Sequence, residues 1–131
     1  MSAGAASYLL QAAIAAEHAR APSWTTTDWP AIVSHYDQLA TLTRSPIVLV
    51  NRAVAISFAD GPAVALPLLD ELAGDDRLSG SHLLFLARAD VRSRLGHPTE
   101  AAELYRAALD LASTEPERAL LRRRLAELDV S

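Results

Sequence analysis

The side chains in this sequence that are most able to bind a metal ion or move a proton near neutral pH are its four histidines. They are His18, His35, His82 and His97. No two of them have a spacing, such as His-Glu-x-x-His, that places two imidazoles on one helix face. The sequence also lacks cysteine, a glycine-rich phosphate loop and a Gly-x-Ser-x-Gly nucleophile motif. We therefore expect no metal, no cofactor and no catalytic residue, so that the chain is not an enzyme.

Two arginines lie among apolar residues at positions that suggest a structural pairing. Arg52 and Arg88 occur in matching contexts, each followed by alanine. Burying one such charge without a partner would cost on the order of several kcal/mol. We therefore expect both arginines to pair across helices with carboxylates, for which the candidates are Asp37, Asp70 and Asp90.

The same region also allows a functional interpretation, in which the concave side of a helical stack holds a peptide or a carboxylate terminus. The candidate partner-binding side chains on that side are Asn51, Arg52, His82 and Asp90. Trp24 lies in a threonine-rich loop and is a further candidate as an interface anchor, with packing over a helix end as the alternative. Trp29 lies on an apolar helical stripe and is expected in the core.

The composition restricts the class of protein further. The 131 residues suit one domain, and half of them are hydrophobic while only 5% are aromatic, which favours helices over sheets. The net charge of −4 argues against direct binding of nucleic acid. All twelve basic residues are arginine. The run 122–124 spreads around a helix and is expected to be a solvated face. The apolar stretch 5–16 has no cationic start and is too short to span a membrane, which predicts a cytoplasmic protein.

Hydrophobic periodicity and capping residues predict seven helical segments. Their approximate ranges are 7–20, 28–44, 45–60, 62–72, 81–95, 98–112 and 114–128. Asp28, Ser45 and Thr114 are the expected N-caps. Thr114 and Glu117 together have the pattern of a capping box. Pro67 lies past the first turn of its segment, so we expect a kink or a late helix start there.

The helical segments repeat with a spacing close to that of tetratricopeptide repeats, whose period is about 34 residues. Gly61 and Gly96 each end one helix and lead through a proline into the next, and Leu69 and Leu104 occupy equivalent places. Small and aromatic residues follow the repeat pattern in the second unit, at Ala89, Gly96, Ala101, Tyr105 and Ala108. The alanines would let two helices approach closely, and the tyrosine would fill the gap to the next unit.

We therefore predict an all-α fold in which antiparallel helical hairpins stack as a short tetratricopeptide-repeat-like α-solenoid of about seven helices. Residues 1–131 then form a single domain. It comprises a degenerate helical pair (7–44), two repeats (45–73 and 81–112) and a capping helix (114–128).

Several strings of residues resemble one family over nearly the whole chain. The most specific are Thr27-Asp28-Trp29-Pro30 and Ser45-Pro46-Ile47-Val48, the second followed by Asn51-Arg52-Ala53-Val54-Ala55. Ala87-Arg88-Ala89-Asp90 and Glu115-Pro116-Glu117-Arg118 extend the match. In these strings the chain resembles the C-terminal tetratricopeptide-type extension of extracytoplasmic-function RNA polymerase sigma factors, within the sigma-70 family. Pro67 departs from the family pattern, which usually has a plain helix former there.

The resemblance implies a parent function in transcription initiation, in which this domain is a non-catalytic, regulatory protein-interaction module. It implies that the partners are the N-terminal sigma regions or RNA polymerase in the full-length protein, and a small YCII-related protein of the DGPF type. The basic, DNA-contacting sigma regions have no counterpart in these residues, so the chain looks like the extension alone. A second hypothesis stays open, namely a free-standing tetratricopeptide-type adapter that docks a peptide of an unrelated protein.

Overall fold

The fold is all-helical, as expected. The computed structural model describes residues 28–43 and 45–128, and within them it contains six α-helices, one short 3₁₀ turn and no strand. The helices are α2 (Trp29–Leu42), α3 (Pro46–Ala59), α4 (Pro62–Leu72), α5 (His82–Arg94), α6 (Pro98–Leu111) and α7 (Glu115–Glu127). The 3₁₀ turn η2 (Asp76–Leu78) lies between α4 and α5. The helix expected at 7–20 and Trp24 lie outside the described residues.

Side-chain capping explains where α2 and α7 begin. The Asp28 carboxylate accepts a hydrogen bond from the Ala31 amide at 3.1 Å and so caps α2, as predicted. The capping box of α7 is also confirmed, since the Thr114 hydroxyl accepts from the Glu117 amide while Glu117 accepts from the Thr114 amide. Ser45 occupies the N-cap position of α3, but its side chain makes no capping hydrogen bond.

Helix α4 corrects one expectation about Pro67. The helix begins at Pro62 and continues through Pro67 to Leu72, so the late start expected from the internal proline is wrong. Gly61 supplies the reason, because its positive φ of 104° turns the chain directly into the helix, and a proline is well suited to the first helical position. The ring of Pro67 is tolerated on the exposed side of a short helix.

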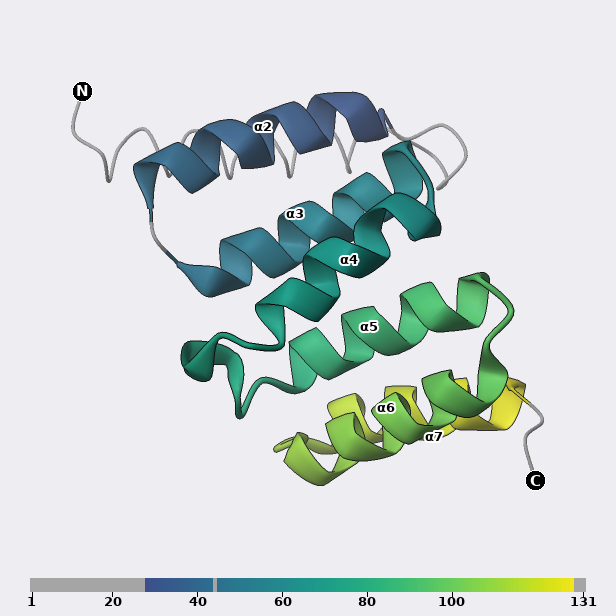
Figure 1. Cartoon of the computed structure of the whole chain (residues 1–131). Helices are drawn as coiled ribbons and strands as arrows, with labels where there is room; N and C mark the ends of the chain where they lie inside the picture. Colours follow the sequence, from purple (N-terminus) through teal and green to yellow (C-terminus); the bar gives the residue numbers. More distant parts are fainter. Residues whose placement is uncertain (1–27, 44, 129–131) are drawn as a thin grey trace.

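Successive helices lie side by side along the molecule, as Figure 1 shows, with α7 behind α6 in that view. Each helix packs against the next, and α3 also contacts α5, which is the pattern of stacked helical hairpins. The helices approach closely because small residues lie between them, with Ala53, Ala89, Ala101 and Ala108 almost completely buried. Tyr105 is only 2% exposed and packs with Leu121 of α7, so the predicted aromatic plug between units is confirmed.

The expected arginine pairs join the hairpins to one another. Arg52 Nε lies 2.5 Å from Asp37 Oδ1, and Arg88 Nε lies 3.2 Å from Asp70 Oδ1. In both pairs the arginine is the seventh residue of its helix, and the aspartate is the ninth residue of the helix before it. The α2–α3 and α4–α5 contacts therefore repeat the same ion pair, and the structural interpretation of these arginines is confirmed.

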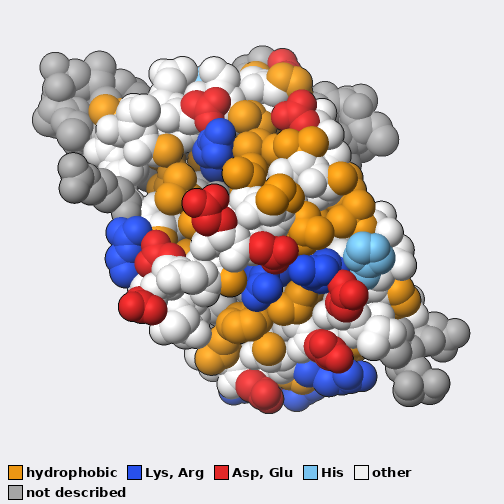
Figure 2. Space-filling model, viewed as in Figure 1, with side chains coloured by type: hydrophobic (Ala, Val, Ile, Leu, Met, Phe, Trp, Pro, Cys, Tyr) orange, Lys and Arg blue, Asp and Glu red, His pale blue; other side chains and the backbone are white. Residues whose placement is uncertain are grey.

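The second of these pairs is part of a larger charged cluster. Asp70 also accepts from Arg92 at 3.2 Å, and Arg92 in turn donates to Glu100 at 2.6 Å. These side chains come from α4, α5 and α6. Figure 2 shows red and blue side chains gathered across the face on which these three helices lie, with hydrophobic side chains between them.

Candidate protein-interaction surface

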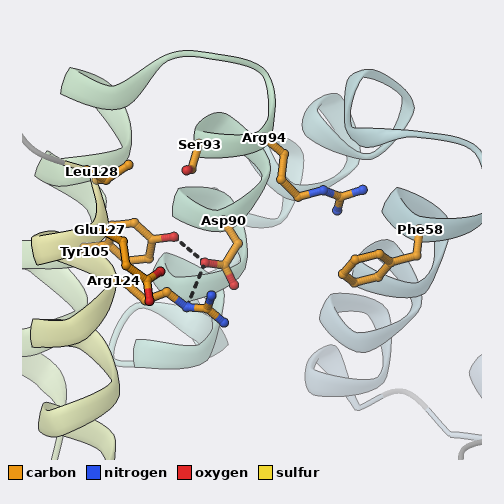
Figure 3. A pocket seen from close by; sticks show the side chains of 8 residues that line it. All are labelled: Phe58, Asp90, Ser93, Arg94, Tyr105, Arg124, Glu127 and Leu128. Carbon is orange, nitrogen blue, oxygen red and sulfur yellow. Dashed lines mark hydrogen bonds and ion pairs between the residues drawn. The ribbon is translucent and has the colours of Figure 1, made fainter. Parts of the chain in front are cut away.

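A hollow of about 490 Å³ lies where α3, α5, α6 and α7 come together (Figure 3). The residues that line it are Phe58, Asp90, Ser93, Arg94, Tyr105, Arg124, Glu127 and Leu128. Helical spacing brings them to one face, because Asp90 and Arg94 are four residues apart on α5, and Arg124 and Leu128 are four apart at the end of α7. The contact between α3 and α5 adds Phe58 to this face.

One side of the hollow is a hydrogen-bonded group on α5, α6 and α7. The Tyr105 hydroxyl donates to the Asp90 carboxylate, and Arg124 Nε lies 3.7 Å from Asp90 Oδ1 (Figure 3). Burial of the ring, followed by the hydrogen bond to Asp90, raises the pKa of Tyr105 above its ordinary value. Arg124 Nε is buried and has no hydrogen-bond partner among the residues that the structure describes, so it contributes to the site mainly as a charge facing Asp90. The negative charge of Asp90 is thus compensated inside the protein.

The other side of the hollow is built on Phe58 and Arg94. The two terminal nitrogens of Arg94 donate to the hydroxyl and to the carbonyl oxygen of Ser57, each at 2.7 Å. Its guanidinium carbon lies 4.3 Å from the centre of the Phe58 ring, and Trp29 stacks on the same ring with centroids 4.6 Å apart. The Phe58 ring thus contacts both Trp29 and Arg94. Phe58 nevertheless remains 39% exposed.

The charge of Arg94 is only weakly compensated. No ion pair joins it to a carboxylate in the part of the chain that the structure describes, although Asp90 acts on it from a distance. Desolvation by burial lowers the pKa of Arg94, which indicates that the surroundings disfavour its charged form relative to water.

The structure brings together some of the sequence-predicted binding residues and separates others. Asp90 lines the large hollow, while Asn51 is exposed and lines a neighbouring hollow of about 120 Å³ that also includes Phe58. His82 is the first residue of α5, and its Nε2 lies 3.6 Å from Oε1 of Glu117 on α7. Arg52 lines a different hollow of about 320 Å³ with side chains of α4, next to its partner Asp37. Trp24 lies outside the described residues.

Other residues of the site were not anticipated as such. Neither Phe58 nor Arg94 belongs to a recognisable motif. The only sign of Phe58 was a large aromatic residue near the end of a mostly apolar helix. Arg124 was expected on a solvated face, yet its Nε is buried against Asp90, while its neighbour Arg122 is exposed and pairs with Glu115. A helix considered alone does not show which of three consecutive arginines turns toward the next helix.

The described residues contain no group of three or more histidine or acidic side chains arranged to hold a metal ion. None of the described helices combines the length and apolar character needed to cross a bilayer.

The chain is 40% identical over 121 residues to an uncharacterized protein of Rhizobium meliloti (strain 1021). The matched segment is 92% of this chain but 28% of that protein, so the chain corresponds to less than a third of its relative's length. No family model matches the sequence, and no solved structure matches it.

Proposed function

We propose that this chain is a regulatory protein-interaction domain, namely the C-terminal helical extension of an extracytoplasmic-function sigma factor. The observation that carries the interaction role is the hollow between α3, α5, α6 and α7, which combines an exposed aromatic ring with charged side chains from several helices. Exposed aromatic and arginine side chains are enriched at protein interfaces. The assignment to sigma factors rests on the motif strings described above.

The comparison supports the idea of a domain within a longer protein. The relative from Rhizobium meliloti extends far beyond the region that matches this chain, as expected if the helical stack accompanies other domains. In the proposal, those other domains are the regions that contact DNA and the polymerase.

Charge supports sigma regions as the partner. DNA-binding regions are basic, whereas this chain carries a net charge of −4. Opposite charges of this kind accelerate association and favour the correct partner, and their effect falls with salt. In this proposal the domain regulates initiation by occupying surfaces of the sigma regions that otherwise contact the polymerase or promoter.

A titration against the sigma regions tests the proposal. The first step is to determine whether the gene that encodes this chain also encodes two sigma regions. Those regions are then titrated with the purified chain by calorimetry at low and high salt. The expected result is saturable binding that weakens as salt rises, together with altered promoter activity of the sigma factor when the extension is deleted. The absence of sigma regions from the gene, or no binding together with unchanged promoter activity, contradicts the proposal.

The alternative is a tetratricopeptide-type adapter for a peptide of an unrelated protein. The open hollow beside Asn51 and Phe58 favours it, because an extended peptide fits such a surface without any sigma region. Binding of the chain to partners other than sigma regions, in a gene that encodes none, distinguishes the adapter from the sigma extension.

A further inference from the structure

Arg94 is fixed in place, and no carboxylate of residues 28–43 and 45–128 forms an ion pair with it. Its two hydrogen bonds to Ser57 and its stacking on Phe58 hold the guanidinium in one orientation. Ser57 is itself buried at 1% exposure and donates its hydroxyl to the Val54 carbonyl at 2.6 Å, so the support is rigid. A guanidinium has five N–H donors, and Ser57 uses only two nitrogens of this one. Donors therefore remain for a ligand at the edge of the hollow.

The remaining charges of the hollow do not neutralise Arg94. Asp90 is already engaged by the Tyr105 hydroxyl and by Arg124. Figure 3 shows Arg94 reaching toward Phe58, away from the group formed by Asp90, Tyr105 and Arg124. An anionic group placed beside Arg94 would thus find a preorganised, undercompensated cation, which is favourable because the protein has already lost the side-chain entropy.

We propose that the hollow binds a segment of a partner protein through a peptide carboxylate on Arg94, with a neighbouring hydrophobic side chain packed against the exposed part of Phe58. This deepens the proposed function, since it rests on the chain being a protein-interaction domain and names the chemistry its partner must offer. Arg94 supplies the charge-assisted hydrogen bonds, and Phe58 supplies apolar contact.

The chemistry of the hollow favours a peptide over other anions. Its volume of about 490 Å³ is in the range of ligand sites, and its walls include apolar side chains that a small inorganic anion would leave uncovered. A nucleic-acid backbone would bring several phosphates next to Asp90 and Glu127, on a chain of net charge −4, and would be repelled. A single carboxylate flanked by apolar groups avoids that repulsion.

Three pools of hexapeptides rich in leucine and phenylalanine, each labelled with an uncharged BODIPY dye, test the proposal. The first contains one aspartate and has an amidated C-terminus, the second contains asparagine and has a free C-terminal carboxylate, and the third contains asparagine and is amidated. Fluorescence anisotropy with the whole chain measures affinity, and the Nε–Hε signal of Arg94 in a nitrogen–proton NMR spectrum reports contact. Because the first two pools differ in where the carboxylate lies, they also show whether an acidic side chain or a chain terminus is preferred.

We expect at least one carboxylate pool to bind about tenfold more tightly than the neutral pool, and to shift the Arg94 signal. Arg94→Gln should lose about tenfold in affinity for that pool. Arg106→Gln is the matched control, since Arg106 is an exposed arginine of α6 outside the hollow, and its affinity should stay within about twofold of the unsubstituted chain. Arg94→Lys keeps the positive charge but not the fork of donors, and should bind with intermediate affinity even if the glutamine variant folds poorly.

Equal binding of all three pools, or unchanged affinity in both Arg94 variants, would overturn the proposal. Its failure is distinct from that of the proposed function. If the sigma regions bind and the carboxylate pools do not, the chain is an interaction domain that uses another surface. If the carboxylate pools bind through Arg94 and no sigma region binds, the site stands and the identity of the partner changes.

Discussion

Tyr105 lies where α5, α6 and α7 pack together. Its ring is buried against Leu121, and its hydroxyl donates to Asp90, which in turn faces Arg124. A hydrogen bond to a charged acceptor stabilises a fold more than one between neutral groups. The hydroxyl therefore joins α6 to α5, and Arg124 brings α7 to the same carboxylate.

Tyr105→Phe should lower the free energy of unfolding by about 1–2 kcal/mol at pH 7, because the Asp90 carboxylate loses a donor. The folded state raises the pKa of Tyr105 above its unfolded value near 10. The stabilisation is therefore complete below pH 10 and is lost as the pH rises toward the folded-state pKa. Urea unfolding followed by circular dichroism between pH 7 and 11 should show the difference between the two proteins shrinking above pH 10. Parallel pH profiles would contradict this; the raised pKa of Tyr36 affects both proteins equally.

Asp70 is the residue on which the charged cluster of α4, α5 and α6 depends, because it accepts from both Arg88 and Arg92. The Asp70 side chain is 37% exposed, so solvent screening reduces the energy of these pairs. Asp70→Asn should lower the free energy of unfolding by about 1–2 kcal/mol, and by less at high salt.

Asp110→Asn is the matched control for this substitution. Asp110 is exposed near the end of α6 and belongs to no ion pair with the described residues, so its replacement should change stability by less than about 0.5 kcal/mol. Denaturant titrations in about 0.05 M and about 1 M salt compare weak with strong screening of the charges. An Asp70 effect that does not depend on salt would show that packing, and not charge, is its cause.

At the scale of elements, α7 depends strongly on its own first turn. Its hydrophobic face is narrow, with Leu121 as its only buried residue among those described, while the capping box satisfies the first amides. Hydrogen bonds from the Ser113 amide, then from the Thr114 amide, and the nearby His82 lower the pKa of Glu117. The start of the last helix is therefore sensitive both to the cap residue and to acid.

Thr114→Ala should lower the free energy of unfolding by about 1 kcal/mol through loss of the cap, which denaturant titration measures.

A lowered pKa in the folded state means that Glu117 stabilises the protein above its unfolded pKa, and that this contribution is lost as the pH falls through the folded-state value. Thermal midpoints measured from pH 7 down to pH 3 should therefore fall more steeply below about pH 4.5 in the unsubstituted chain than in Glu117→Gln. Identical acid profiles for the two proteins would rule out the cap as the source.

At the scale of the whole molecule, the hydrophobic clusters share helices and so couple the hairpins. Helix α3 contributes Ala55 to the cluster with α2 and Ala53 to the cluster with α4 and α5. Helix α5 contributes Ala87 to the second cluster and Ala89 to the cluster with α6 and α7. No hairpin can unfold without exposing part of its neighbour's core, which favours cooperative unfolding in spite of the linear arrangement.

Leu121→Ala, a change at the α7 end, should lower the free energy of unfolding by about 2–4 kcal/mol, because Leu121 is 1% exposed. In a Trp24→Phe background, Trp29 is the only tryptophan and reports on the opposite end of the described stack. In Leu121→Ala, the urea midpoint of the Trp29 fluorescence and that of the helical circular dichroism signal should fall by the same amount. Ala119→Leu on the exposed side of α7 serves as the control and should move neither. Loss of helical signal before the Trp29 transition would show that the stack unfolds from one end.

Much of the helical pattern was predictable because it depends on neighbours in the sequence. Asp28 and Thr114 cap helices through residues three positions away, and the proline at Pro62 begins α4 through its own fixed backbone angle. The pairs of Arg52 and Arg88 were also predictable, since a repeating helical hairpin places equivalent residues against equivalent partners.

The composition of the hollow was not predictable in the same way. Phe58 and Arg94 meet because α3 and α5 contact each other and both residues lie near the C-terminal ends of these helices, whereas a periodic pattern specifies the apolar face of a helix and not which neighbour it contacts. Arg124 turns toward Asp90 because burial of Leu121 fixes the rotation of α7 about its axis.

From the sequence alone followed the helical class, the caps at Asp28 and Thr114 and the repeating ion pairs, because each depends on residues whose spacing along the chain carries the information. Only the tertiary structure decided that Asp90 is neutralised within the protein while Arg94 is held open toward a hollow. The reason is physical: the charge available to a ligand depends on which side chains from different helices come within a few ångströms of one another, and the packing of α3, α5, α6 and α7 determines those distances.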